Sequence, residues 1–180
     1  MIEEVLVVLL ALLVLVTGLW LSWTAQRLDR MHHRIDVARA SLESQRLRRS
    51  ATALELATSG TLDPVRSLLL LDAAARARAA PAEEYEAAES DLSQSLRAVL
   101  ADEREVASLR EDPAVEPLLA ELAVACRKLE LARRFHNDVV VSARALRSRR
   151  RVRWLRLSGR AGPVHSVDLD DVPPRALVAD

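Results

Sequence analysis

The chain opens with a long apolar run and then changes to a regular spacing of apolar and polar residues. The run covers residues 5–23, nineteen positions without a charged side chain. A helix of that length rises about 30 Å, which matches the hydrocarbon core of a bilayer. The pattern therefore predicts one transmembrane helix, preceded by a short N-terminus of residues 1–4.

The flanks of this run favour a retained anchor over a cleaved signal peptide. Glu3 and Glu4 make the first flank acidic, whereas a signal peptide begins with a basic region. Trp20 and Trp23 stand at the far end, where aromatic belts form. Four arginines follow the run, at Arg27, Arg30, Arg34 and Arg39. By the positive-inside rule we expect a cell-membrane protein with its N-terminus outside and its C-terminal domain in the cytoplasm.

Beyond the run, apolar residues recur every three or four positions almost to residue 153, as on one face of a helix. Stop and start signals divide this region, at Ser59-Gly60, Asp63-Pro64, Pro81 and Asp112-Pro113. Asp caps a helix N-terminus and Pro suits its first turn, so these signals separate helices. We expect the membrane helix to continue to about residue 57 and three more helices to follow it. The helix that begins at Pro81 carries an apolar stripe from Tyr85 to Leu109.

Short connections between helices predict antiparallel neighbours. The expected fold class is all-α, with the transmembrane helix continuing into an antiparallel up-and-down four-helix bundle over residues 24–153. A long coiled-coil dimer is the alternative, but each break allows the chain to reverse. Residues 154–180 lack any period and contain Gly, Pro and Asp clusters, so we expect a largely irregular acidic tail, packed locally through Trp154 and Leu157.

The formal net charge is zero, but its distribution is uneven. The densest basic cluster ends the last predicted helix, which returns toward the membrane in an up-and-down bundle. Each arginine near an anionic leaflet contributes about 1 kcal/mol of attraction. We therefore expect anionic lipid to bind a set comprising Arg147, Arg149, Arg150, Arg151, Arg153 and Trp154. A solvated helix end is the alternative, and nucleic acid is not expected because no reader motif is present.

No residues show catalytic or metal-binding spacing. His32 and His33 are adjacent, so on a helix they point about 100° apart, and no second ligand cluster follows. Cys126 lies on an apolar stripe, which favours an inert buried thiol, and a single cysteine excludes an intrachain disulfide. The chain has no glycine-rich phosphate loop and no nucleophile elbow. We expect a non-enzymatic protein without a cofactor and name no catalytic, cofactor or metal residue.

One polar island interrupts the last predicted helix, at residues 133–138. Asn137 is a poor helix former at mid-helix, which predicts a specific hydrogen bond. Arg134, Asn137 and Asp138 are therefore candidates for a contact between helices that sets the bundle register. A contact to a partner protein is the alternative for the same three residues.

Three stretches resemble the LemA family of bacterial membrane proteins, as does the layout of short N-terminus, single span and helical domain. They are RIDVA with RLRR at 34–38 and 46–49, DLSQSL with Leu100 and Ala101 after 91–96, and LELARRFHNDVV at 129–140. The last is the most specific and is similar to the family's A-R-R-x-Y-N-D-A-V, with His136 in place of the tyrosine. The proline expected after the basic pair is absent from residues 53–57. The resemblance implies a four-helix bundle below one membrane helix.

These observations lead to one expected function and one alternative. We expect a single-pass scaffold or docking module at the inner membrane face, with a protein partner whose identity the residues do not specify. The alternative is a sensor or regulatory subunit of an envelope protease or secretion system, in which Asp168–Asp171 reads the partner.

Overall fold

The computed structural model describes residues 1–147 and 165–178, and its first helix is by far the longest. Helix α1 spans Ile2–Thr58 without a break, as the continuous apolar pattern predicted. Its segment Ile2–Trp20 has a mean hydropathy of 2.5 and no buried residue. It is the one helix among the described residues that is long and apolar enough to cross a membrane.

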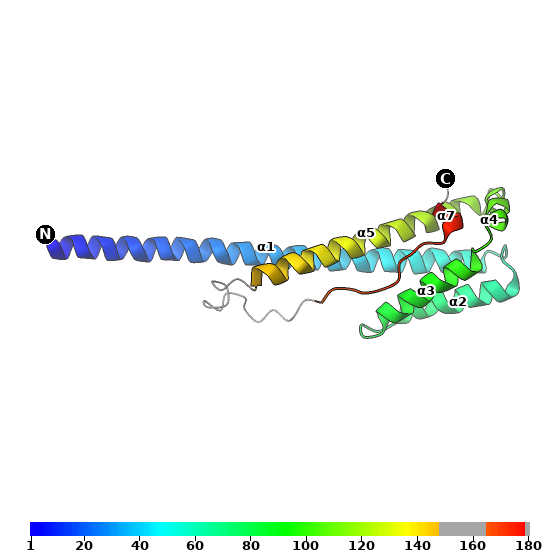
Figure 1. The fold of residues 1–180 in the computed structure, drawn as a ribbon, viewed down its shortest axis with the longest axis horizontal. Coiled ribbons are helices and arrows are strands. Elements are labelled where there is room, and N and C mark those ends of the chain that lie inside the picture. The colour runs from blue at the N-terminus through cyan, green and yellow to red at the C-terminus, as the bar shows by residue number, and fades with distance from the viewer. Residues whose placement is uncertain (148–164, 179–180) are drawn as a thin grey trace. The chain divides into compact units, whose positions relative to one another are not determined.

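The chain divides into two compact units. The first unit consists of Met1–Val37 and Val139–His165, and the second consists of Ala38–Asp138 and Ser166–Asp180. All regular structure in the described residues is helical, which confirms the all-α prediction. After α1 come α2 (Pro64–Ala79), α3 (Tyr85–Val99), α4 (Glu103–Arg110), α5 (Glu116–Arg147) and α7 (Arg175–Val178). Within the second unit α2 and α3 form a packed hairpin (Figure 1). The four longer helices are compatible with the predicted four-helix bundle.

The start signal at Asp63-Pro64 works as expected. The Asp63 carboxylate accepts hydrogen bonds from the backbone N–H groups of Val65 and Arg66, at 3.0 and 3.1 Å. Pro64 is the first helical residue, where its missing N–H costs nothing. Gly60 precedes this cap with a φ of 79°, a left-handed conformation that suits glycine at the end of α1.

The helix expected from Tyr85 to Leu109 is instead two helices. Helix α3 ends at Val99, and α4 begins after Asp102, whose carboxylate caps the N–H groups of Arg104 and Glu105 at 2.9 and 3.4 Å. The apolar spacing of Val106 and Leu109 carries on across this break, which is why periodicity alone did not reveal it. A turn likewise precedes α5, which begins at Glu116 and not directly at the Asp112-Pro113 signal.

The core of the second unit is rich in alanine and leucine, and the C-terminal segment contributes to both of its clusters. The larger cluster includes Leu56, Leu70 and Leu122 together with Ala176 and Leu177 of the C-terminus. The smaller cluster consists of five buried residues, Leu42, Leu129, Ala132, Val167 and Leu169. Residues 166–174 have no regular secondary structure, but they pack on the bundle, and α7 adds one short helix at Arg175–Val178. Trp154 and Leu157 lie outside the described residues.

Candidate functional site

Residues 166–178 are called here the tail segment; residues 166–174 run between α3 and α5 of the second unit, and α7 lies against α4 (Figure 1). The surface that holds residues 166–174 is called here the tail groove. Its polar contacts come from both helices, with Ser90, Ser93 and Arg97 on α3 and Arg133 and Asn137 on α5. These side chains bind the tail segment through its backbone and through two of its carboxylates.

Asn137 binds the backbone of Val167 with both ends of its amide. Its Oδ1 accepts a hydrogen bond from the Val167 N–H at 2.8 Å, and its Nδ2 donates to the Val167 carbonyl at 2.9 Å. The predicted specific hydrogen bond at Asn137 is thus confirmed. Its partner, however, is the tail segment and not another bundle helix, because Asn137 faces the tail groove.

Asp170 has all of its polar groups engaged by α3. Its backbone N–H donates to Ser90 Oγ at 3.0 Å, and its carbonyl accepts from Ser93 Oγ at 2.5 Å. Both carboxylate oxygens accept from Arg97, whose Nη1 also donates to the Val172 carbonyl at 2.8 Å. The hydrogen bond from Arg97 lowers the pKa of Asp170, against the opposing effect of burial.

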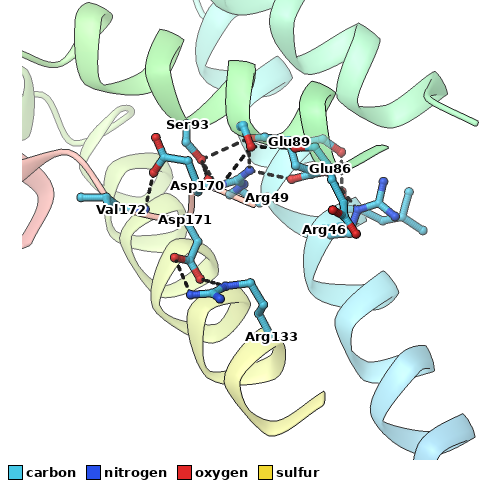
Figure 2. Close-up of polar contacts among 12 residues, drawn as sticks. Arg46, Arg49, Glu86, Glu89, Ser93, Arg133, Asp170, Asp171 and Val172 are labelled. Carbon is cyan, nitrogen blue, oxygen red and sulfur yellow. Dashed lines mark hydrogen bonds and ion pairs between the residues drawn. The ribbon is translucent and has the colours of Figure 1, made fainter. Parts of the chain in front are cut away.

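Asp171 is bound by the opposite wall of the groove. Arg133 Nε donates to one carboxylate oxygen at 2.6 Å and Nη2 donates to the other at 3.1 Å, a bidentate pair that fixes the orientation of both groups (Figure 2). The pKa of Arg133 is raised by the hydrogen bond to Asp171, so this guanidinium stays charged. Asp171 itself is buried, which makes the arginine a necessary partner.

The apolar contacts of the tail segment follow the period of an extended chain. Val167 and Leu169 are buried with Leu129, whereas Asp168 between them is exposed. At the far end, Arg110 of α4 donates from Nη2 to the carbonyls of Ala176 and Leu177, at 3.2 Å each. These carbonyls belong to the last turn of α7, where an arginine satisfies groups that the helix leaves open.

A buried charged cluster lies behind the α3 wall. The side chains of Glu89 and Arg49 are each 1% exposed, and Arg49 Nη2 donates to Glu89 Oε2 at 2.6 Å. Arg46 Nε donates to the other carboxylate oxygen at 3.2 Å, and its guanidinium lies 4.1 Å from the ring centre of Tyr85. Burial of the Tyr85 ring is the main cause of its raised pKa.

Ser93 connects this cluster to the tail segment. Its hydroxyl oxygen accepts from Arg49 Nη1 at 2.8 Å and lies within donating distance of the Asp170 carbonyl (Figure 2). Arg49 in turn is held to α3 by the Glu89 side chain and by the Glu89 carbonyl, at 2.9 Å. The position of the tail segment is therefore linked to a buried ion pair between α1 and α3.

The sequence pattern groups Arg49 with Arg48, as either a further polar contact or a solvated pair, and does not single out Arg46. Arg46 and Arg49 occupy positions on the apolar stripe of α1 between Leu42 and Ala53, both of which are buried. An arginine at a core position needs a carboxylate partner, and Glu89 stands in the corresponding position on the stripe of α3. That spacing is the signal from which the pair was predictable.

The other residues singled out from the sequence either do not contact the tail segment or lie outside the described residues. Arg134 is exposed and pairs with Glu130 one turn earlier on the same helix, and Asp138 is exposed as well, so neither contributes to the tail groove. Arg133, the neighbour of Arg134, takes the role in the groove. Arg147 is the last residue of α5. The remaining lipid candidates lie outside the described residues, at Arg149, Arg150, Arg151, Arg153 and Trp154.

The catalytic inventory of the described residues is short. Among them no group of three or more His, Cys, Asp or Glu side chains is arranged to hold a metal ion. Cys126 is buried, and desolvation raises the pKa of its thiol. A thiol of that kind is a poor nucleophile because its reactive thiolate form is disfavoured.

Comparison of the chain with family models, with curated proteins and with solved structures finds no match. What the site binds is therefore inferred from its geometry alone. That geometry is a set of side chains that bind an extended backbone, two adjacent carboxylates and two apolar residues.

Proposed function

We propose that the protein is a non-enzymatic docking module of LemA type, anchored at the cytoplasmic face of the cell membrane by its N-terminal span. The observation that carries the docking function is the tail groove. Side chains of α3 and α5 hold an extended segment by its backbone, which is how a protein binds polypeptide without depending on every side chain of the ligand.

The membrane part of the proposal is supported by α1. Its apolar segment is exposed along its whole length, with Leu6 67% and Leu13 63% exposed. An apolar surface of this size is stable in contact with lipid and aggregates in water. The same helix then supplies Leu42, Arg49 and Leu56 to the bundle, so the anchor and the docking domain share one uninterrupted element.

Membrane insertion and orientation are tested together by cysteine labelling. The native Cys126 is buried, so an added cysteine is the reactive one. In intact cells or spheroplasts, a membrane-impermeant maleimide is expected to label Glu3→Cys, and to label Asp138→Cys only after lysis. Labelling of Asp138→Cys in intact cells would overturn the orientation. Extraction of the chain by alkaline carbonate would overturn the span.

The docking function itself is tested by purification from detergent. A stoichiometric protein that co-purifies with the full chain is the expected result, and a partner with catalytic activity would favour the regulatory-subunit alternative. A chain that isolates alone after crosslinking in cells contradicts the docking function.

We further propose that the basic cluster at the end of α5 and beyond, Arg147, Arg149, Arg150, Arg151, Arg153 and Trp154, holds the domain against anionic lipid. Flotation of the span-deleted chain with anionic and neutral vesicles tests this. Preference for the anionic vesicles, reduced by about 1 kcal/mol for each arginine replaced by glutamine, is expected. Equal flotation with both vesicle types removes the lipid proposal.

A further inference from the structure

The contacts of the tail groove do not require that its occupant be attached to the bundle. Val167 is bound through its N–H and its carbonyl, and Asp170 likewise. The Val172 carbonyl accepts from Arg97. Every donor or acceptor on the bundle side of these contacts is a side chain of α3 or α5. A separate peptide in the same extended conformation presents the same backbone groups and therefore forms the same bonds.

The groove is selective for the side chains of two consecutive acidic residues. Neighbouring residues of an extended chain point to opposite sides. Asp170 accordingly meets Arg97 on α3, and Asp171 meets Arg133 on α5. Val167 and Leu169 lie on the same side of the extended chain as Asp171, and both are buried in the smaller apolar cluster. The groove therefore fits a segment with the pattern apolar–any–apolar–acidic–acidic, which residues 167–171 have in this chain.

Two arginines of the groove, and not the net charge of the bundle, favour an acidic occupant. Among the ion pairs of the described residues, the partners of Arg97 and Arg133 are tail carboxylates, whereas Arg46 and Arg49 pair with carboxylates of the bundle. The bundle therefore supplies two groove arginines whose counter-charges come from the segment that occupies the groove. Arg49 of α1, behind Ser93, is already neutralised by Glu89 and leaves the charge of this wall to Arg97.

Residues 166–172 are the part of the tail segment that a second peptide replaces, because Ala176 and Leu177 of α7 are buried in the larger core cluster. The Arg97 and Asp170 side chains are 32% and 31% exposed, so solvent screens their ion pair. Asp168 and Val172 point to solvent. Only Val167 and Leu169 enter the smaller core cluster, which a second peptide with apolar residues at these positions also fills.

We propose that the tail groove is a docking site for an extended acidic segment of a partner protein, with the pattern apolar–any–apolar–acidic–acidic, and that residues 166–172 of the chain's own tail segment occupy this site until the partner segment displaces them. This inference rests on the proposed docking function, for which it names the surface and the chemistry of the partner. The tail segment is in effect a competing ligand whose attachment raises its local concentration.

The test uses the full chain in detergent and a fluorescein-labelled peptide with the sequence of residues 165–178. In the chain variant D170N/D171N the attached tail loses both carboxylates and competes less. By fluorescence polarisation, this variant is expected to bind the labelled peptide at least tenfold more tightly than the unaltered chain does. The peptide carrying the same two asparagines is expected to bind neither chain. A peptide with Asp168→Asn, which alters an exposed residue, is the matched control and binds like the original.

Adjacent arginines of α5 supply the matched control on the bundle side. In the D170N/D171N chain, Arg133→Gln is expected to weaken peptide binding at least tenfold, and Arg134→Gln to leave it unchanged. Circular dichroism identifies the variants that retain their helix content, and only these are compared. The proposal is overturned if a folded D170N/D171N chain fails to bind the peptide, or if both arginine variants behave alike. It is also overturned if the unaltered chain is a dimer that D170N/D171N dissociates, because the occupant is then the tail of a second copy.

The outcome is separable from that of the docking function. A chain that resists carbonate extraction and co-purifies with a partner, but binds no peptide after D170N/D171N, keeps the docking function and loses the groove assignment. A chain that binds the peptide but is found outside the membrane and without a partner keeps the groove and loses the proposed function.

Discussion

Replacing Glu89 with glutamine removes the one carboxylate that Arg46 and Arg49 share in the core. Arg49 and Glu89 have side chains that are each 1% exposed, so water cannot take over the lost interaction. Breaking a buried ion pair from one side costs about 3–5 kcal/mol because the remaining charge stays buried without a partner. For a chain of 180 residues each kcal/mol lowers Tm by about 2–4 °C, so Glu89→Gln is expected to lower it by roughly 6–20 °C.

Thermal and guanidinium denaturation of the full chain in mild detergent, followed by circular dichroism, measures this change. The matched control is Glu121→Gln, because Glu121 pairs with Arg48, also on α1, but these side chains are 41% and 48% exposed. An exposed pair of this kind contributes about 0–1 kcal/mol. If Glu89→Gln and Glu121→Gln destabilise the chain equally, or if Glu89→Gln costs less than about 1 kcal/mol, the argument from buried charge is refuted.

A double-mutant cycle separates the pair from its surroundings. The cycle consists of Arg49→Met, Glu89→Leu and the two combined. The combined variant replaces the Arg49–Glu89 pair by apolar groups, a change that is often close to neutral in other proteins, while Arg46 keeps Glu43 as its partner. The double variant is therefore expected to be more stable than Glu89→Gln alone. A double variant that is less stable than Glu89→Gln would show that packing around Arg49, and not its charge, dominates the effect.

Three further predictions concern the tail segment and the core thiol. Asn137→Leu removes both hydrogen bonds to Val167, at a cost of about 1–3 kcal/mol, so hydrogen exchange at the Val167 amide is expected to accelerate, while Arg134→Gln leaves it unchanged. Unchanged exchange in Asn137→Leu would contradict the assigned contact. Because Arg97 lowers the pKa of Asp170, the stabilisation that it contributes is complete above the unfolded pKa of about 3.9 and is lost as pH falls through the lower folded value. Hydrogen exchange of the tail amides is therefore expected to reveal opening below about pH 4, and opening between pH 6 and 8 would be inconsistent with this sign. Burial raises the pKa of Cys126, so an aromatic disulfide reagent at pH 7 is expected to react with it only in denaturant, and rapid reaction of the native chain would contradict its burial.

Features of this protein that depend on near neighbours were readable along the chain. The uncharged run and the unbroken apolar spacing led to α1 as one continuous helix, and the Asp63-Pro64 pair marked the start of α2. A helix is stabilised by contacts between residues three or four apart, so its signals are local. The same reliance on local spacing explains the missed break at Leu100–Asp102, where the apolar period continues while the backbone turns.

The tertiary structure decided which distant groups meet. A mid-helix Asn137 indicated a hydrogen bond, but its partner stands 30 positions later in a segment without any period. Arg49 and Glu89 are 40 positions apart, and neither residue type suggests burial on its own. Buried charges and backbone groups require partners, yet the partner is chosen by how the helices pack and not by spacing along the chain. The periodicity of the sequence therefore determined the helices of this protein. Packing determined that the acidic C-terminal segment lies between α3 and α5, because Arg97, Arg133 and Asn137 come together between these two helices.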